Sequence, residues 1–362
     1  MWVQPFRSAQ SLAVPDKSNQ DQRVAVLLNT NARKVDAKVI RALSHVVHDG
    51  DLFLSRSELD ARRIARTVVE RGYSTVFLGG GDGTFTCFVN EIANQVQQRR
   101  KVGAQAMPTF GVLRLGTGNG LASLVHASAP RGQGFLDDVL RVRAGEARDV
   151  RTLDLLSIEG KRAPFAGLGL DGQLLNDYLW VKRNLGKGVL HKTMSGAGGY
   201  FTSVAFRTLP YYLANSATVG CEVVNGKNDN AYRMAPDGSR TQTFAPGEVI
   251  YRGPLMMAAA GTIPYYGFDL KIFPFAAQAR GFMNLRLGTV APLKIVANLQ
   301  GLWNGDWFPE GLHDFHVNDA TVRFDRPMPF HVSGDAEGYR QELRLQVAPE
   351  PIDIVDFGRA LN

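Results

Sequence analysis

The stretch TVFLGGGDGTF, residues Thr75 to Phe85, decides the fold of this chain. Its first four residues have the β-branched and aromatic composition of a strand, its middle is a glycine turn, and the apolar spacing of residues 84–99 is that of a helix. Glycines let phosphate oxygens reach backbone N–H groups, and a helix N-terminus adds about half a positive charge at the same place. The stretch therefore predicts a phosphate cradle, in which Asp82 offers the hard oxygen that Mg²⁺ prefers.

A second glycine-rich turn, GTGNG at residues 116–120, follows the next predicted strand, at residues 109–113. The strand predicted before the first turn is preceded by two others, at residues 24–29 and 52–55. Because the carboxyl ends of parallel strands meet at one edge of a sheet, both glycine turns and the ends of these strands face one crevice. A single nucleotide could span both turns.

The pattern of predicted secondary structure changes near residue 149. Before it, short strands alternate with amphipathic helices, which is typical of a parallel sheet; after it come short strand-like runs rich in Gly and Pro, which indicate antiparallel structure. We therefore predict an α/β plus all-β chain, with a Rossmann-like nucleotide domain over residues 22–148 and an antiparallel β-sandwich domain over residues 149–345. A basic segment at residues 177–212 is either lid-like or a solvated helical hairpin.

Charge and cysteine usage narrow the partners and the compartment. The 41 Lys and Arg against 34 Asp and Glu leave a net charge of +7, which favours an anionic partner, but the charges are spread along the chain and do not favour nucleic acid. Only two cysteines are present, so we exclude a disulfide framework and expect a cytoplasmic protein. No apolar run reaches the roughly 20 residues of a membrane span, so we expect any membrane contact to be peripheral, at an anionic inner membrane face.

The two turns carry a resemblance to a known family. GGDGT at residues 80–84 and GTGN at residues 116–119 resemble the lipid kinases of the diacylglycerol kinase and sphingosine kinase superfamily. The similarity extends through PFAGLGLDG (residues 164–172) and PYYGFDLKIF (residues 264–273) to HVSGDAEG at residues 331–338. This resemblance implies an α/β domain that binds ATP, a β-sandwich domain that binds the lipid, and a C-terminal tail, residues 346–362, that returns to the first domain.

The resemblance also implies roles for particular residues. The implied ATP contacts are Asn29, Thr30, Ser55, Gly80, Gly81, Asp82, Gly83, Thr84, Gly116, Thr117 and Asn119. Asp82 and Asp335 would serve Mg²⁺, and Asp171 would meet the hydroxyl of the lipid substrate. Either Glu337 or Asp82 would accept the proton of that hydroxyl, as phosphoryl transfer requires.

Departures from the family pattern keep other functions open. The first strand ends in Asn29-Thr30-Asn31 where the family often has N-P-x-S-G, and GTGN lacks the acidic residue that often follows it. The second departure slightly favours a sphingoid base or ceramide over diacylglycerol, although the sequence does not identify the lipid or the oligomeric state. One alternative is an NAD kinase, a family that shares GGDGT. Another is a non-catalytic lipid- or nucleotide-binding module of the same fold.

Overall fold

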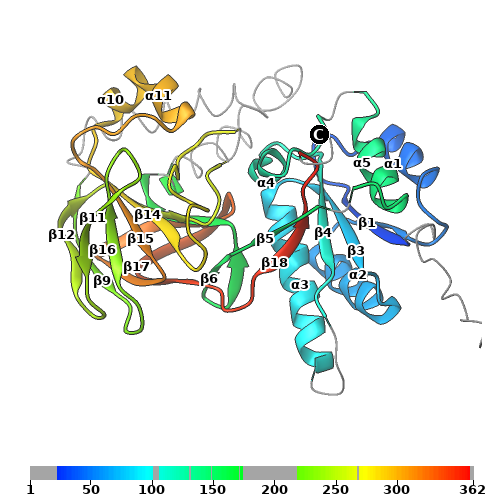
Figure 1. The fold of residues 1–362 in the computed structure, drawn as a ribbon, viewed down its shortest axis with the longest axis horizontal. Coiled ribbons are helices and arrows are strands. Elements are labelled where there is room, and N and C mark those ends of the chain that lie inside the picture. The colour runs from blue at the N-terminus through cyan, green and yellow to red at the C-terminus, as the bar shows by residue number, and fades with distance from the viewer. Residues whose placement is uncertain are drawn as a thin grey trace, which may run out of the picture.

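The computed structural model describes residues 23–100, 106–129, 132–147, 149–170, 172–173, 218–266 and 269–358. They form two lobes that lie side by side, an α/β lobe and a β lobe (Figure 1). Extended segments near residues 154 and 349 join the lobes. The predicted fold class is confirmed.

A six-stranded sheet forms the centre of the α/β lobe, in the order β2-β1-β3-β4-β18-β5. Its strands are β1 (Val24–Asn29), β2 (Leu52–Ser55), β3 (Thr75–Gly80), β4 (Thr109–Arg114), β5 (Val150–Leu153) and β18 (Ile352–Val355). All pairs are parallel except β18 with β5. The ends of β1, β2, β3 and β4 therefore share one edge, which brings the predicted loops together.

Five helices among the described residues pack around this sheet. They are α1 (Ala37–Ser44), α2 (Glu58–Arg71), α3 (Asp82–Arg100), α4 (Gly120–Leu124) and α5 (Gly134–Arg143). The ends of α2 follow from the sequence, because Ser57 accepts a hydrogen bond from the Asp60 N–H at its start and Gly72 ends it with φ +67°. Helix α3 begins two residues earlier than predicted, because the Gly81 carbonyl already accepts the helical hydrogen bond of Phe85.

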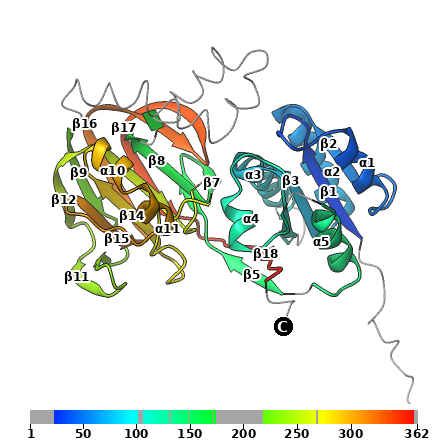
Figure 2. The ribbon, with the colours of Figure 1, turned by 90° about the horizontal axis from the view of Figure 1, so that it is seen from above.

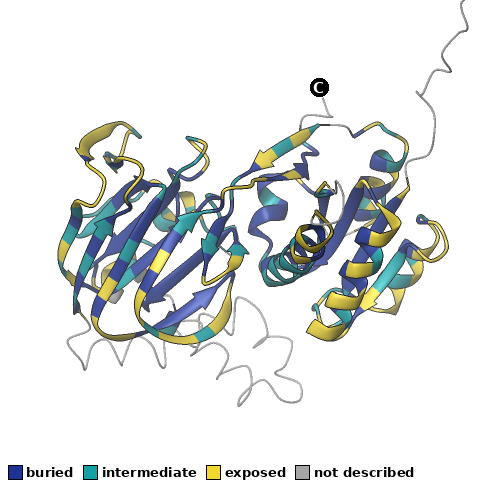
Figure 3. Cartoon of the chain, turned by 90° about the horizontal axis from the view of Figure 1, so that it is seen from below, coloured by how far each residue is buried: buried dark blue, intermediate teal, exposed yellow. Residues whose placement is uncertain are grey.

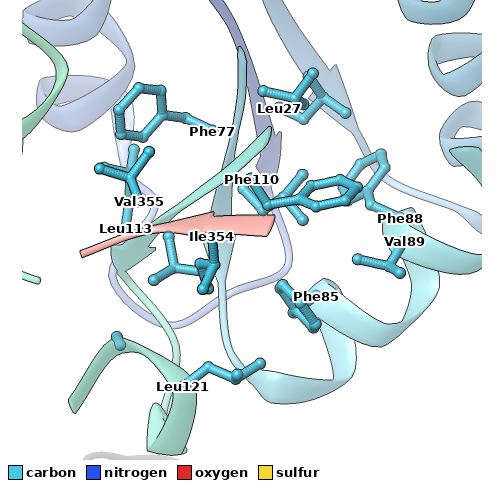
Figure 4. Packing of buried hydrophobic residues seen from close by; sticks show 14 of the residues in the cluster. Leu27, Phe77, Phe85, Phe88, Val89, Phe110, Leu113, Leu121, Ile354 and Val355 are labelled. Atoms are coloured by element: carbon cyan, nitrogen blue, oxygen red, sulfur yellow. The ribbon is translucent and has the colours of Figure 1, made fainter. Parts of the chain in front are cut away.

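The core of the α/β lobe includes residues from both ends of the chain. Phe77 of β3 and Phe110 of β4 are fully buried, as are Phe88 of α3 and Ile354 of β18 (Figure 4). Ile354 pairs with Phe110 on the neighbouring parallel strand β4. Each such side chain contributes about 1.5–3 kcal/mol by leaving water. The C-terminal strand is therefore an integral part of the first lobe.

The β lobe is one continuous antiparallel sheet of twelve strands among the described residues. They are β6 (Leu156–Ile158), β7 (Lys161–Ala163), β8 (Phe165–Gly169), β9 (Val219–Asn225), β10 (Ala231–Met234), β11 (Arg240–Phe244), β12 (Val249–Leu255), β13 (Met257–Gly261), β14 (Met283–Gly288), β15 (Leu312–Val317), β16 (Asp319–Val332) and β17 (Asp335–Val347). Strand β16 pairs with β8, β9 and β17, so the sheet curls around a second core (Figure 3). Two short helices, α10 (Pro292–Ala297) and α11 (Leu299–Asn304), lie on its outside.

A buried ion pair lies in this second lobe. Arg286 of β14 donates two hydrogen bonds of 2.8 Å to Asp314 of β15, and the side chains are only 1% and 4% exposed. Asn284 donates to the same carboxylate at 2.9 Å. Breaking such a pair from one side leaves a buried charge without its partner, which is costly.

Two expectations fall outside the described residues. They are Asp171 and the basic segment at residues 177–212, which is described nowhere along its length. The predicted domain boundaries stay predictions; the change of sheet lies between β5 and β6, after Leu153. Within the described ranges, no helix has the length and apolar character needed to cross a membrane.

Candidate active site

The two glycine turns touch each other through their backbones. A Cβ added to Gly116 would lie 2.3 Å from both the Cα and the N of Gly81, and one added to Gly81 would lie 2.8 Å from the Gly118 carbonyl oxygen. These distances leave no room for a side chain at either position. The two turns that the sequence singles out therefore form one continuous backbone surface at the edge of the sheet.

Asp82 joins the two turns. Its carboxylate accepts hydrogen bonds from the N–H groups of Gly120, at 3.1 Å, and Leu121, at 3.2 Å, in the first turn of α4. The residue is 5% exposed, and burial raises the pKa of Asp82 against the lowering effect of these two hydrogen bonds. The structure thus gives Asp82 a tertiary partner that the sequence does not reveal.

Two asparagines fix the shape of the turns. Asn119 accepts from the Gly116 N–H at 3.2 Å and donates to the Gly116 carbonyl at 3.0 Å, which closes the second turn on itself. Asn29, at the end of β1, donates to the Thr84 hydroxyl at 3.0 Å in the first turn of α3. The Thr84 side chain in turn fills the space beside Gly80, where a Cβ would lie 2.4 Å from its hydroxyl oxygen.

Thr30 and Ser55 join β1 to β2. The N–H and the hydroxyl of Thr30 donate to the Ser55 carbonyl at 2.9 and 3.0 Å, and the buried Ser55 hydroxyl donates to the Ser57 carbonyl at 3.0 Å. Thr117 lies half-buried in the second turn. The structure thus brings all the described candidate nucleotide contacts to one edge of the first sheet.

The β lobe brings an acidic turn to this edge. Ser333 and Gly334, with φ of +51° and +84°, form the tight turn between β16 and β17. The Asp335 Oδ2 atom lies 2.5 Å from where a Gly83 Cβ would be, so the carboxylate rests on the first turn of α3. The Ser333 and Thr86 hydroxyls are 2.7 Å apart and connect the lobes beside it. Figure 2 shows α3 facing the β lobe.

Asp335 and Glu337 have different surroundings. Desolvation, followed by the neighbouring Glu337 charge, raises the pKa of Asp335, although the residue keeps more than a third of its surface exposed. Glu337 instead forms an ion pair with Lys161 of β7. Strand β7 is itself held along α3, because Asn90 exchanges two hydrogen bonds of 2.8 Å with the backbone of Arg162.

Basic residues at the same edge were not among the predicted site residues. Lys34 lies in the loop after β1, and its N–H donates to the Leu115 carbonyl at 3.2 Å. Burial, then the charges of Arg114 and Arg33, lower the pKa of Lys34. The sequence could have indicated these residues. Arg114 ends β4 and Lys34 follows the end of β1, and both strand ends were predicted to face the crevice.

The described acidic side chains do not form a metal-binding site by themselves. No group of three Asp, Glu, His or Cys side chains that could hold a metal ion occurs in the part of the chain that the structure describes. Both oxygens of Asp82 are already acceptors for backbone N–H groups. Mg²⁺ characteristically binds through phosphate oxygens, waters and one or two carboxylates. Among the described residues, the site therefore fits a Mg²⁺ ion that is held mainly by the phosphates of a bound nucleotide.

The fold and site together define a two-lobed protein, with two glycine turns at the edge of one lobe and acidic residues supplied by the other. Residues 23–155 match the family model of the diacylglycerol kinase catalytic domain. This match confirms the resemblance to the lipid kinase superfamily over the N-terminal lobe, which is similar to a kinase catalytic domain of that type.

Solved structures share this fold across both lobes. A candidate diacylglycerol kinase from Bacillus anthracis strain Sterne aligns with a TM-score of 0.62 at 14% identity, over 94% of this chain and 99% of that one. A diacylglycerol kinase structure from the same strain aligns with a TM-score of 0.58 at 12% identity, over 94% and 98%. At this identity the likeness establishes the fold alone. A sequence search of curated proteins found no match.

Proposed function

We propose that the protein is an ATP- and Mg²⁺-dependent kinase that transfers the γ-phosphoryl group to a hydroxyl of a lipid: diacylglycerol, a sphingoid base or ceramide. The contact between Asp335 and the Gly83 position supports this proposal most directly. It brings a carboxylate from the second lobe to the helix N-terminus where the phosphates of a nucleotide would bind. A substrate hydroxyl held by the β lobe would therefore meet the γ-phosphate at the junction of the lobes.

The proposed reaction needs a proton acceptor. The lipid hydroxyl oxygen attacks the γ-phosphorus, the bond from that phosphorus to the β–γ bridging oxygen breaks, ADP leaves, and the hydroxyl proton passes to a carboxylate. Asp335 is the better-placed acceptor, because its carboxylate touches the glycine turn and its raised pKa strengthens it as a base. Glu337, held by Lys161, would position the turn and balance its charge.

The glycine turns would hold the nucleotide. The turn before α3 lies at the N-terminus of that helix, where the helix dipole and the backbone N–H groups of a first turn favour phosphate. Asp82 and Asn119 would keep both turns in shape through hydrogen bonds to backbone groups. Mg²⁺, when bound, would neutralise phosphate charge, as it does in other phosphoryl transfers.

The lipid and the membrane belong to the same proposal. A net charge of +7 favours an anionic surface, and a lipid acceptor requires reversible contact with a membrane or micelle. We therefore propose that the protein works in the cytoplasm at the inner membrane face and binds the membrane peripherally.

The test is a direct kinase assay. The purified protein is incubated with ATP, Mg²⁺ and detergent-dispersed diacylglycerol, sphingosine, ceramide or monoacylglycerol, with NAD as a separate acceptor, and phosphorylated products are measured. We expect one lipid product, and none from NAD. A phosphorylated NAD product, or ATP binding without turnover on any acceptor, would contradict the proposal.

Variants of β17 then test the proton acceptor. Asp335→Asn should lower kcat by about 10²–10⁴-fold, the usual contribution of general base catalysis. Glu342→Gln is the matched control, because Glu342 lies on the same strand in an exposed ion pair with Arg323 and should leave kcat unchanged. If Glu337→Gln lost more activity than Asp335→Asn, Glu337 would be the acceptor instead.

A further inference from the structure

Asp269 is held in an unusual backbone conformation. It lies in the β lobe with φ +63°, a left-handed value that a non-glycine residue adopts at a cost. The turn that contains it is closed by a 2.7 Å hydrogen bond from the Tyr266 N–H to the Leu270 carbonyl. From this turn, the Asp269 carboxylate reaches across to the α/β lobe.

The partners of Asp269 lie at the second glycine turn. The carboxylate accepts a hydrogen bond from Arg114 at 2.6 Å and another from the Ser123 hydroxyl. Arg114 ends β4, two residues before Gly116. The turn is also pressed against the α/β lobe, because a Cβ on Gly120 would lie 3.1 Å from the Tyr265 backbone oxygen. Packing thus holds the Asp269 carboxylate beside the second glycine turn.

The charges around Asp269 are those of an anion site. The charge of the Asp269 carboxylate favours the protonated form of Lys34. The same charge disfavours the ionised form of Asp82 and so contributes, after burial, to its raised pKa. Lys34 and Arg114 repel each other, so their region carries more positive charge than Asp269 alone balances. The side chains of Arg114 and Asp269 are 26% and 43% exposed, so a ligand entering the crevice can reach their ion pair.

We propose that Arg114 and Lys34 form a subsite for the phosphates of the nucleotide, and that the Asp269 carboxylate occupies this subsite until the nucleotide displaces it. This inference rests on the proposed function, because it assumes that ATP binds in the crevice. A triphosphate carries several negative charges and competes effectively for cations held by one carboxylate. Asp269 therefore acts as an intramolecular competitor that weakens nucleotide binding.

Two substitutions in this ion pair should have opposite effects. Asp269→Asn keeps the shape and the left-handed tolerance of the residue but removes its charge, so the Kd for ATP should fall about fivefold. Arg114→Gln removes a phosphate ligand, so the Kd should rise about tenfold. Asp154→Asn is the matched control, because it disrupts the Asp154–Arg280 pair, which also connects two loops but lies outside the crevice. It should leave the Kd unchanged.

The measurement is calorimetric titration with ATP and, separately, with inorganic tripolyphosphate, alongside thermal unfolding of each variant. Opposite shifts for Asp269→Asn and Arg114→Gln with both ligands support the subsite. Weaker binding in both variants would mean that the ion pair only holds the lobes together, and would overturn the inference. If the wild type bound tripolyphosphate with these opposite shifts but phosphorylated no lipid, the subsite would stand and the lipid kinase would not. No binding of either ligand would reject both.

Discussion

Replacing Gly116 by alanine tests whether the contact between the glycine turns is needed. The new Cβ would lie 2.3 Å from the Cα and N of Gly81, whereas non-bonded carbon atoms rest about 3.5 Å or more apart. The turns must therefore separate by about 1 Å. Both contact atoms belong to backbone, so no side chain can rotate away to relieve the overlap.

The expected magnitude follows from this separation. Overpacking of this kind costs about 1–3 kcal/mol, of which the reduced freedom of the unfolded chain returns about 0.4–1 kcal/mol. We expect Gly116→Ala to lower the free energy of unfolding by about 1–2 kcal/mol and, for a chain of this length, the melting temperature by about 1–3 °C. A 1 Å displacement of groups that position a substrate costs roughly 10²-fold in rate, so turnover should fall by about that factor.

The control is a buried glycine that has room for a side chain. A Cβ on Gly288, in β14, would lie 3.5 Å from the Leu312 side chain and 3.6 Å from that of Met257, which is ordinary contact. Gly288→Ala should therefore keep both stability and turnover. Thermal unfolding and turnover are measured for both variants. Wild-type stability and turnover in Gly116→Ala would refute the reasoning that the turns act as one backbone surface.

Three further changes test other parts of the structure. Burial alone would raise the pKa of Asp51, but hydrogen bonds, chiefly from Arg23, hold this pKa below its usual value. The stability lost in Asp51→Asn should therefore be largest above about pH 4 and should vanish as the pH falls further. A pH series of denaturant titrations measures this loss. Asp314→Ala leaves Arg286 buried without its partner and should cost about 3–5 kcal/mol in the same titrations. Asn90→Ala removes two hydrogen bonds between the lobes and should lower stability by about 1–3 kcal/mol, seen as a reduced unfolding midpoint.

Local signals in the sequence were sufficient for much of the first lobe. The strand before the glycine turn matches the prediction, because its β-branched and aromatic residues favour a buried strand. The ends of α2 at Ser57 and Gly72 likewise follow from capping residues that act within a few positions. The common edge of the two glycine turns also followed, since parallel strands place their carboxyl ends together.

Tertiary structure alone decided which distant groups meet at the site. Asp82 finds its partners 38 and 39 residues away on α4, Asp335 reaches Gly83 from the other lobe, and Asp269 reaches Arg114 across 155 residues. A carboxylate can accept from many N–H or guanidinium donors, so its residue type does not specify its partner. The partner is selected when the two cores form and bury particular faces against each other. The sequence by itself therefore determined the glycine crevice, and packing determined which charges surround it.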